Sequence, residues 1–255
     1  MWTTKKKRGE RMNIYADTDI GMVRKMNQDS YYISEENDNY KLCILADGMG
    51  GYTGGEIASR LACVSTAEYI KENLKNDNQY RKEKLIKIIH QAMQRANEIV
   101  FEKSREYEEL EQMGTTLEVC LIYNNKAYIG HIGDSRIYKI QQNSMKKITT
   151  DHSYVQKLVK DGTITQEEAI NHPKKNMLMK ALGCEETIEP DVMVQNFNQG
   201  DIILICSDGL TNMIAEQEIY NIITRNIAEA PQKLIKKAKE LGGYDNITVI
   251  IIANN

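Results

Sequence analysis

Four apolar, strand-like runs of this chain meet an aspartate at one end, and this pattern limits the folds that the chain can adopt. Three aspartates end the runs KLCILAD, AYIGHIGD and DIILICSD, and the fourth lies just before ITVIIIA. The four residues are Asp47, Asp134, Asp208 and Asp245. An ionised carboxylate against an apolar core is costly unless positive charge pairs with it. The fold must therefore place these side chains where cations reach them.

We expect these four carboxylates to lie together at one edge of a sheet, on adjacent antiparallel strands. One Asp-Gly or Gly-Asp pair is common in turns and carries little information. Four aspartates at strand boundaries are harder to explain by turn chemistry, because like charges at one edge repel unless cations hold them. Ligands that are all oxygen select hard ions, so the pattern predicts a Mg²⁺ or Mn²⁺ site.

Two further residues are candidates for a role at this site, Gly48 as a metal ligand and Arg24 as a phosphate-binding residue. Gly48 directly follows Asp47, and a glycine lets its backbone carbonyl approach an ion as a further ligand. Arg24 precedes Asp29 by five positions in GMVRKMNQD. A guanidinium near clustered metals suits bidentate pairing with a phosphate.

The chemistry of such a centre is phosphate-ester hydrolysis. Water shared by two divalent ions loses a proton near neutral pH, since one ion alone can lower its pKa to about 7. The hydroxide would attack phosphorus in line while the ions and Arg24 take up charge on the equatorial oxygens. A cysteine phosphatase is excluded by spacing, because none of the five cysteines is followed by arginine six positions later.

Hydrophobic periodicity predicts an α+β protein. Helical patterns extend over residues 56–76 and 81–107, and the apolar face of each helix needs a sheet to pack against. Short strand-like runs separated by turn residues favour antiparallel sheets. The runs cover residues 12–19, 30–36, 40–46, 115–123, 126–133, 135–141, 145–150, 188–197, 201–207 and 247–253. Helices come in blocks instead of alternating with strands, which argues against a doubly wound parallel sheet.

The chain is expected to form one domain over residues 12–255, preceded by a flexible tail at 1–11. Short helical pieces replace the strand pattern between Asp151 and Gly183, which predicts a flap at 152–183 over one end of the sheets. We expect this flap to determine which substrates bind.

Composition describes an ordinary globular chain of 255 residues, 41% hydrophobic and 27% charged, with only 3 prolines. A formal net charge of −3 favours neither nucleic acid nor an anionic membrane surface as a partner. Five cysteines without a Cys-x-x-Cys pair indicate buried free thiols in a reducing compartment. No apolar stretch approaches membrane-spanning length. We expect a soluble, cytoplasmic monomer.

Eight motifs of the chain occur in the order found in the protein phosphatase 2C family, the metal-dependent serine/threonine phosphatases. They are GMVRKMNQD, ADGMGG followed by GGE, MGTT, GDSR, DHS, HPKKNMLMKALG, SDGL and YDNITV. Over about residues 12–253 the chain resembles the compact bacterial members of this family.

The resemblance implies a four-layer α-β-β-α sandwich with a binuclear Mn²⁺ or Mg²⁺ site at one end. It implies that Asp47 bridges both metals, that the Gly48 carbonyl binds one of them, and that Asp208 and Asp245 hold the other. Asp29 would act through bound water, and Asp134 would bind a third metal together with Asp208. Arg24 would clamp the substrate phosphate, and Glu56 and Asn246 would support the ligands. Glu56 is equally well explained as an acidic residue favoured by the helix dipole.

Several residues have a structural explanation beside the functional one. His131 and His152 flank motif positions without ligand spacing to another histidine, so core packing or support of the ligands is expected for both. The preference of threonine for strands explains Thr115 and Thr116, although the family places them near the site. Met49 stands where many eukaryotic relatives carry a histidine proposed as general acid, which leaves that acid unassigned.

These observations predict a metal-dependent protein phosphatase that hydrolyses phosphoserine and phosphothreonine. Family habit implies that it opposes a bacterial serine/threonine kinase and acts on that kinase's substrates. Two alternatives stay open: a regulatory phosphatase with a single phosphoserine partner, and a pseudophosphatase that only binds. Keeping every motif carboxylate together with Arg24 argues against the second.

Overall fold

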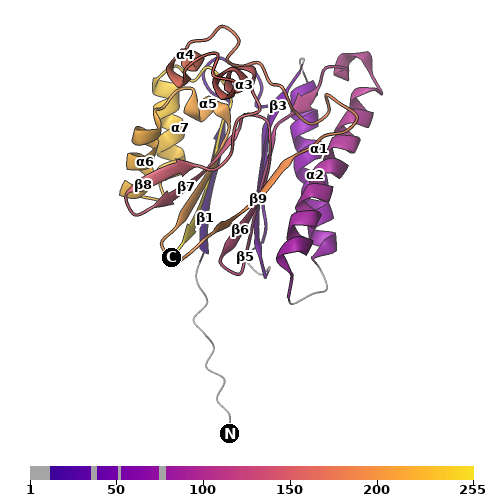
Figure 1. The fold of residues 1–255 in the computed structure, drawn as a ribbon. Coiled ribbons are helices and arrows are strands. Elements are labelled where there is room, and N and C mark those ends of the chain that lie inside the picture. The colour runs from indigo at the N-terminus through magenta and orange to yellow at the C-terminus, as the bar shows by residue number, and fades with distance from the viewer. Residues whose placement is uncertain (1–11, 36–38, 51–52, 75–78) are drawn as a thin grey trace.

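The computed structural model describes residues 12–35, 39–50, 53–74 and 79–255, and it forms four layers: two antiparallel sheets face each other, and helices cover each outer face (Figure 1). This is the predicted α-β-β-α sandwich. The predicted tail at 1–11 lies outside the described residues.

The first sheet contains strands from both ends of the chain. In order across the sheet they are β1 (Met12–Asp19), β11 (Ile247–Asn254), β10 (Ile202–Cys206), β7 (Arg136–Gln141) and β8 (Ser144–Lys147). Every pairing in this sheet is antiparallel. Helices α6 (Glu216–Arg225) and α7 (Ala230–Glu240) cover its outer face, beside the short α5 (Asp208–Thr211).

The second sheet lies against the first. In order its strands are β2 (Asp29–Ile33), β3 (Lys41–Met49), β5 (Leu117–Tyr123), β6 (Lys126–Ile132) and β9 (Asp191–Asn196), and β4 (Gly114–Thr115) pairs with the end of β3. Its outer face is covered by α1 (Gly54–Asn73) and α2 (Lys82–Ser104), with the 3₁₀ turn η1 (Glu108–Leu110) following α2.

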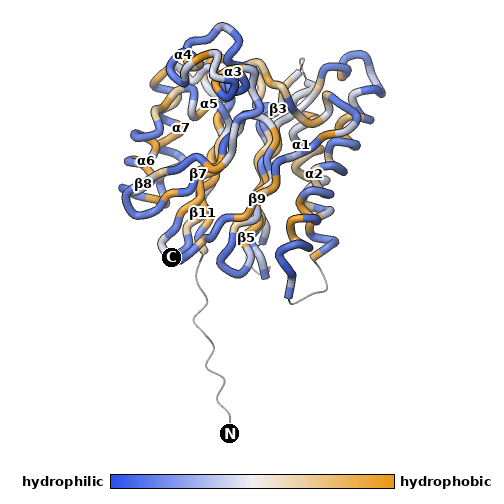
Figure 2. The backbone as a smooth tube through the Cα atoms, viewed as in Figure 1, coloured by the Kyte–Doolittle hydropathy of each residue, from blue (hydrophilic) through white to orange (hydrophobic). Residues whose placement is uncertain are grey.

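Strand alternation explains why both sheets are buried on two faces. In β3, Leu42 and Ile44 pack toward α1 and α2, whereas Cys43 and Leu45 join the core between the sheets. Successive strand side chains point to opposite faces, so a strand buried on both sides reads as a continuous apolar run. Figure 2 shows this apolar character along the inner strands, with polar residues on the outer turns.

The predicted flap region contains two short helices, α3 (Tyr154–Lys160) and α4 (Gln166–Ile170), at the end of the sandwich opposite the C-terminus (Figure 1). Ser153 caps α3 by accepting a hydrogen bond from the backbone N–H of Gln156. Thr165 and Glu168 form a capping box at the start of α4. The helical pieces are confirmed, and their action as a flap stays a prediction.

Both long predicted helices and every predicted strand are present, with ends shifted by a few residues. Helices α6 and α7 were not predicted from their residues. All five cysteines are free, as expected, but Cys184 is exposed where a buried thiol was predicted. Within the described ranges, no helix combines the length and the apolar character needed to cross a membrane.

Candidate metal centre

The predicted aspartates lie at one end of the sandwich but come from two sheets, so the expectation of one sheet edge with adjacent strands is wrong. Asp47 lies in β3 and Asp134 follows β6, and these two strands of the second sheet are separated by β5. Asp208 follows β10 and Asp245 precedes β11, which are neighbours in the first sheet. The chain crosses between sheets in the turn from β6 to β7, so consecutive strands need not be partners.

Asp47 also does not end its strand. β3 continues to Met49, because Gly48 and Met49 pair with Thr115 and Gly114 of β4. Thr115 and Thr116 hold the backbone of Asp47 at both its carbonyl and its N–H. The carbonyl accepts from the N–H of Thr116 and from Oγ1 of Thr115, both at 2.9 Å. The N–H donates to Oγ1 of Thr116 at 3.0 Å. The two threonines therefore position this carboxylate, which strand propensity alone did not reveal.

The carboxylates are close enough to raise one another's pKa. Burial raises the pKa of Asp47 well above its ordinary value, and the charges of Asp29 and Asp208 raise it further. Burial together with the charge of Asp245 raises the pKa of Asp208 to about 6. Burial and the charge of Asp208 raise the pKa of Asp134 to about 8. Without cations, this cluster therefore retains protons near neutral pH.

Asp29 lies where the two sheets meet. It faces Asp47 across the β2–β3 pair. Its Oδ2 accepts from Ser207 Oγ, just after β10, at 2.8 Å and from Thr248 Oγ1, in β11 of the other sheet, at 2.7 Å. Its buried Oδ1 has no hydrogen-bond partner among the described residues. Burial raises the pKa of Asp29 to about 7. A buried oxygen without a partner needs an explanation, and an ion-bound water would supply one.

The Asp47–Gly48 segment is a tight cradle. A Cβ atom at Gly48 would lie 2.0 Å from the carbonyl oxygen of Gly55 in α1, so no larger residue fits without moving the backbone. Gly48 also donates its N–H to the carbonyl of Gln28, which precedes Asp29. The absence of a side chain at Gly48 thus lets three segments meet beside Asp47: β3, the first turn of α1, and the residue before β2.

Asp245 and Arg24 form the exposed side of the cluster. Arg24 Nη2 lies 2.7 Å from Asp245 Oδ2, and the arginine side chain is 51% exposed. This hydrogen bond raises the pKa of Arg24, so the guanidinium is charged at any relevant pH. The sequence did not predict this ion pair, because the two residues are 221 positions apart.

Asn246 anchors this side of the site. Its Oδ1 accepts from the N–H of Gln28 at 2.8 Å, and its Nδ2 donates to the carbonyls of Ile20 and Met26, both at 2.9 Å. These bonds hold the loop that carries Arg24 against the start of β11. For Glu56, in the first turn of α1, no side-chain hydrogen bond is found within the described residues, so its supporting role stays a prediction.

The histidines flanking the motifs form a network of their own, in which His131 is buried and His152 partly buried. His131 Nδ1 lies 2.6 Å from Glu118 Oε1, its Nε2 donates to the carbonyl of Thr150, and its ring stacks on His152 at 4.6 Å. Burial and the neighbouring His131 lower the pKa of His152 to about 4. Both histidines therefore pack inside the fold, as expected, and His152 also supports the turn before Asp134, because its Nδ1 accepts from the N–H of Gly133 at 3.2 Å. Glu118, a charged residue inside the apolar strand β5, was not among the predicted residues.

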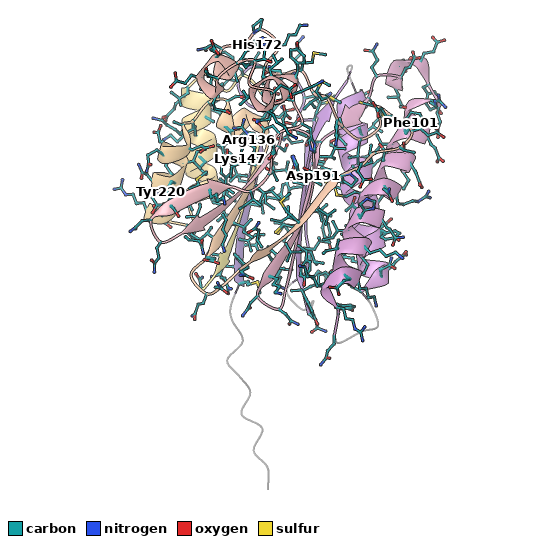
Figure 3. The ribbon with its side chains drawn as sticks, in the orientation of Figure 1. Phe101, Arg136, Lys147, His172, Asp191 and Tyr220 are labelled. Atoms are coloured by element: carbon teal, nitrogen blue, oxygen red, sulfur yellow. The ribbon has the colours of Figure 1, made fainter. Side chains whose placement is uncertain are left out.

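An ion-pair cluster ties the start of the predicted flap to the first sheet. Asp151 Oδ2 lies 2.7 Å from Arg136 Nη2, and its Oδ1 lies 3.1 Å from Lys147 Nζ. Figure 3 shows Arg136 and Lys147 together on this sheet, with Asp191 on the second sheet and His172 farther out in the flap region. The loop from Gly133 is bound here too, since its carbonyl accepts from the N–H of His152.

The donor set fits hard divalent cations. Every candidate ligand is oxygen, each candidate carboxylate except Asp29 keeps part of its surface exposed, and Asp29 offers its unpartnered oxygen. In the described part of the chain, no three His, Cys, Asp or Glu side chains converge tightly enough to enclose one ion by themselves. Ions held here would complete their shells with water, as Mg²⁺ usually does.

The stabilisation of the folded chain by bound Mn²⁺ should depend on pH. The raised carboxyl pKa values mean that the folded, metal-free chain binds more protons than the unfolded chain between about pH 4 and pH 8, so its unfolding free energy falls as pH rises through this range. Mn²⁺ binds the ionised form, so the gain in Tm from Mn²⁺ over EDTA should be roughly 5–10 °C at pH 8 and smaller at pH 6. Thermal unfolding monitored by fluorescence measures both gains. Equal gains at the two pH values would contradict the proton competition.

The chain is similar to known phosphatases over nearly its full length. Residues 23–241 match the family model described as protein phosphatase 2C. A serine/threonine phosphatase of Listeria welshimeri is 37% identical over 240 residues, which cover 93% of this chain and 94% of the relative. The structure of the Mycobacterium tuberculosis serine/threonine phosphatase PstP/Ppp has a TM-score of 0.85 at 34% identity, covering 95% of this chain and 98% of that one. A PstP catalytic domain solved in complex with 2 manganese ions has a TM-score of 0.82 at 33% identity, covering 95% and 97%.

Proposed function

The chain belongs to the protein phosphatase 2C family and is a metal-dependent serine/threonine phosphatase, and we propose that the carboxylate cluster at the end of its sandwich is the catalytic centre. The observation that carries this proposal is the meeting of carboxylates from both sheets around Asp29, whose buried Oδ1 lacks a partner among the described residues. In their ionised form, carboxylates gathered in this way repel one another unless cations neutralise them.

In this proposal Asp47, the Gly48 carbonyl, Asp208 and Asp245 would hold two divalent ions, with Asp47 shared between them. Asp134 would hold a third ion together with Asp208. When bound, the ion pair supplies a hydroxide from a shared water and neutralises charge on the phosphoryl group. Mn²⁺ and Mg²⁺ both suit the oxygen donors.

The chain's own residues then hold the reacting groups in place. Arg24 binds two phosphoryl oxygens through its planar fork and moves away from Asp245 to do so. Asp29 orients water through its free Oδ1, since Ser207 and Thr248 fix its other oxygen. Thr115 and Thr116 keep the Asp47 carboxylate aimed at the centre by holding its backbone. Positioning and charge stabilisation supply most of the catalysis of phosphoryl transfer.

Phosphorylated proteins are the substrates of a serine/threonine phosphatase, and we assign this chain a cytoplasmic, monomeric role opposing a bacterial serine/threonine kinase. Its free thiols suit a reducing compartment. Residues 12–255 act as one catalytic domain in which 152–183 form the flap.

The activity is tested with a panel of phosphoserine, phosphothreonine and phosphotyrosine peptides, assayed with EDTA and with added Mn²⁺. We expect hydrolysis of many phosphoserine and phosphothreonine peptides, complete loss on chelation and recovery with Mn²⁺. Hydrolysis of one phosphoserine partner alone would indicate a dedicated regulatory enzyme. Undiminished hydrolysis in EDTA would contradict the metal mechanism.

A further inference from the structure

A cavity of about 470 Å³ opens beside the metal centre, between α2 and the segment that follows the flap helices. Its apolar wall is formed by Met49, Ile132, Leu178, Met179, Ala181 and Ile188. The polar side of the cavity is formed by Gln94, Lys180, Glu185, Thr187 and Glu189. Cavities of this size that combine an apolar wall with polar groups are typical of binding sites.

The cavity is joined to the predicted catalytic residues by two strands. Met49 lies two positions after Asp47 in β3, so both side chains point to the same face of the sheet. Ile132 lies two positions before Asp134. An extended chain advances about 3.3 Å per residue, so residues within two positions of a phosphoserine at the centre come level with the cavity.

The chemistry of the walls indicates what would enter. Met179 is 44% exposed at the rim, which leaves apolar surface in water. Lys180 donates to the carbonyl of Glu189 at 3.5 Å and forms no ion pair within the described part of the chain. Glu185 and Glu189 line the same cavity, so its polar wall carries charges of both signs. A buried apolar side chain with charged neighbours outside fits this arrangement.

We propose that this cavity is a specificity pocket that receives an apolar side chain of the phosphoprotein within two residues of the phosphorylated one. The proposal depends on the proposed phosphatase function and names a substrate preference for it. Binding energy gained by a part of the substrate away from the reacting group would select among phosphoproteins.

The preference is tested with phosphothreonine peptides that differ at one position, leucine against serine, at each of the two positions on either side. We expect leucine to raise kcat/KM about tenfold at one of these positions. Equal kcat/KM values at all four positions would overturn the pocket. A small aryl phosphate cannot reach the pocket, so its hydrolysis measures the catalytic centre alone. If the enzyme did not hydrolyse the aryl phosphate, the proposed function would be contradicted, and not only the pocket.

Two methionines of the same segment give a matched pair of variants. Met177 and Met179 are 48% and 44% exposed, so either can be replaced without opening the core, but only Met179 lines the cavity. Met179→Ser should reduce the preference for leucine about threefold or more, with aryl phosphate hydrolysis unchanged. Met177→Ser should keep the preference. The same effect from both variants would contradict a pocket at Met179.

Cys184 provides a binding measurement that does not need turnover. It lines the cavity and is exposed, whereas the other four cysteines are buried, so a maleimide should label it selectively. A leucine-containing phosphonate peptide that cannot be hydrolysed should slow this labelling severalfold, and the serine peptide should not. Cys184→Ser reports any labelling elsewhere. Equal labelling rates with both peptides would exclude occupancy of the pocket.

Discussion

Replacing Asp208 by alanine should lower phosphatase activity by about a thousandfold or more, with Mn²⁺ present in excess. Asp208 lies two positions after the end of β10, and Asn212 Nδ2 donates to its Oδ2 at 3.0 Å, which fixes its orientation. Losing one preorganised charge-stabilising group costs about 10²–10³ in rate, and Asp208 is assigned to two of the proposed ions. The measurement is kcat/KM on a phosphothreonine peptide across a Mn²⁺ titration.

Two controls separate lost chemistry from lost folding. Asp208→Asn keeps the shape and should be nearly as inactive, because the amide carries no charge. Asp161→Ala removes an exposed carboxylate at the end of α3 and should keep full activity. An Asp208→Ala enzyme that retains a tenth of the wild-type activity would contradict the assignment.

Replacing Arg24 by alanine should raise KM by about 10- to 100-fold, the range expected when hydrogen bonds to a charged group are lost, with a smaller fall in kcat. The guanidinium lies at the exposed side of the cluster, where it can bind phosphate in the ground state and in the transition state alike. Arg24→Lys should recover only part of the loss, since an ammonium lacks the planar fork. Steady-state kinetics on one phosphopeptide gives both constants.

The neighbouring lysine is the matched control for Arg24. Lys25 is exposed in the same loop, and Lys25→Ala should leave KM unchanged. The half-saturating Mn²⁺ concentration should be followed in parallel, because Arg24 also contacts Asp245. An unchanged KM in Arg24→Ala would remove the phosphate-clamp role.

Local pattern predicted the elements well where it was regular. The alternating and continuous apolar runs gave the strands, and the long stripes gave α1 and α2. Helices α6 and α7 were missed because they are only 10 and 11 residues long and neither has a side-chain N-cap hydrogen bond. In α6, Ile219, Ile222 and Ile223 are β-branched and favour strands intrinsically, so packing against the first sheet decides their state.

The candidate site could be predicted in its residues but not in its geometry. A strand pattern identifies an aspartate at its end, yet it does not say which sheet the strand joins, and so the one-edge expectation failed. The partners of Asp29 were equally hidden, because Ser207 and Thr248 look like ordinary strand residues until the sheets pack face to face. Contacts between distant segments are set by tertiary packing, which sequence periodicity does not predict.

The most direct test of the central idea is a crystal of the chain grown with Mn²⁺ and measured at a wavelength where manganese scatters anomalously. Two strong peaks about 3.5–4 Å apart, both in contact with the Asp47 carboxylate and one of them with Asp208 and Asp245, are the expected result. A single peak, or peaks that avoid Asp47, would contradict a binuclear centre built from both sheets.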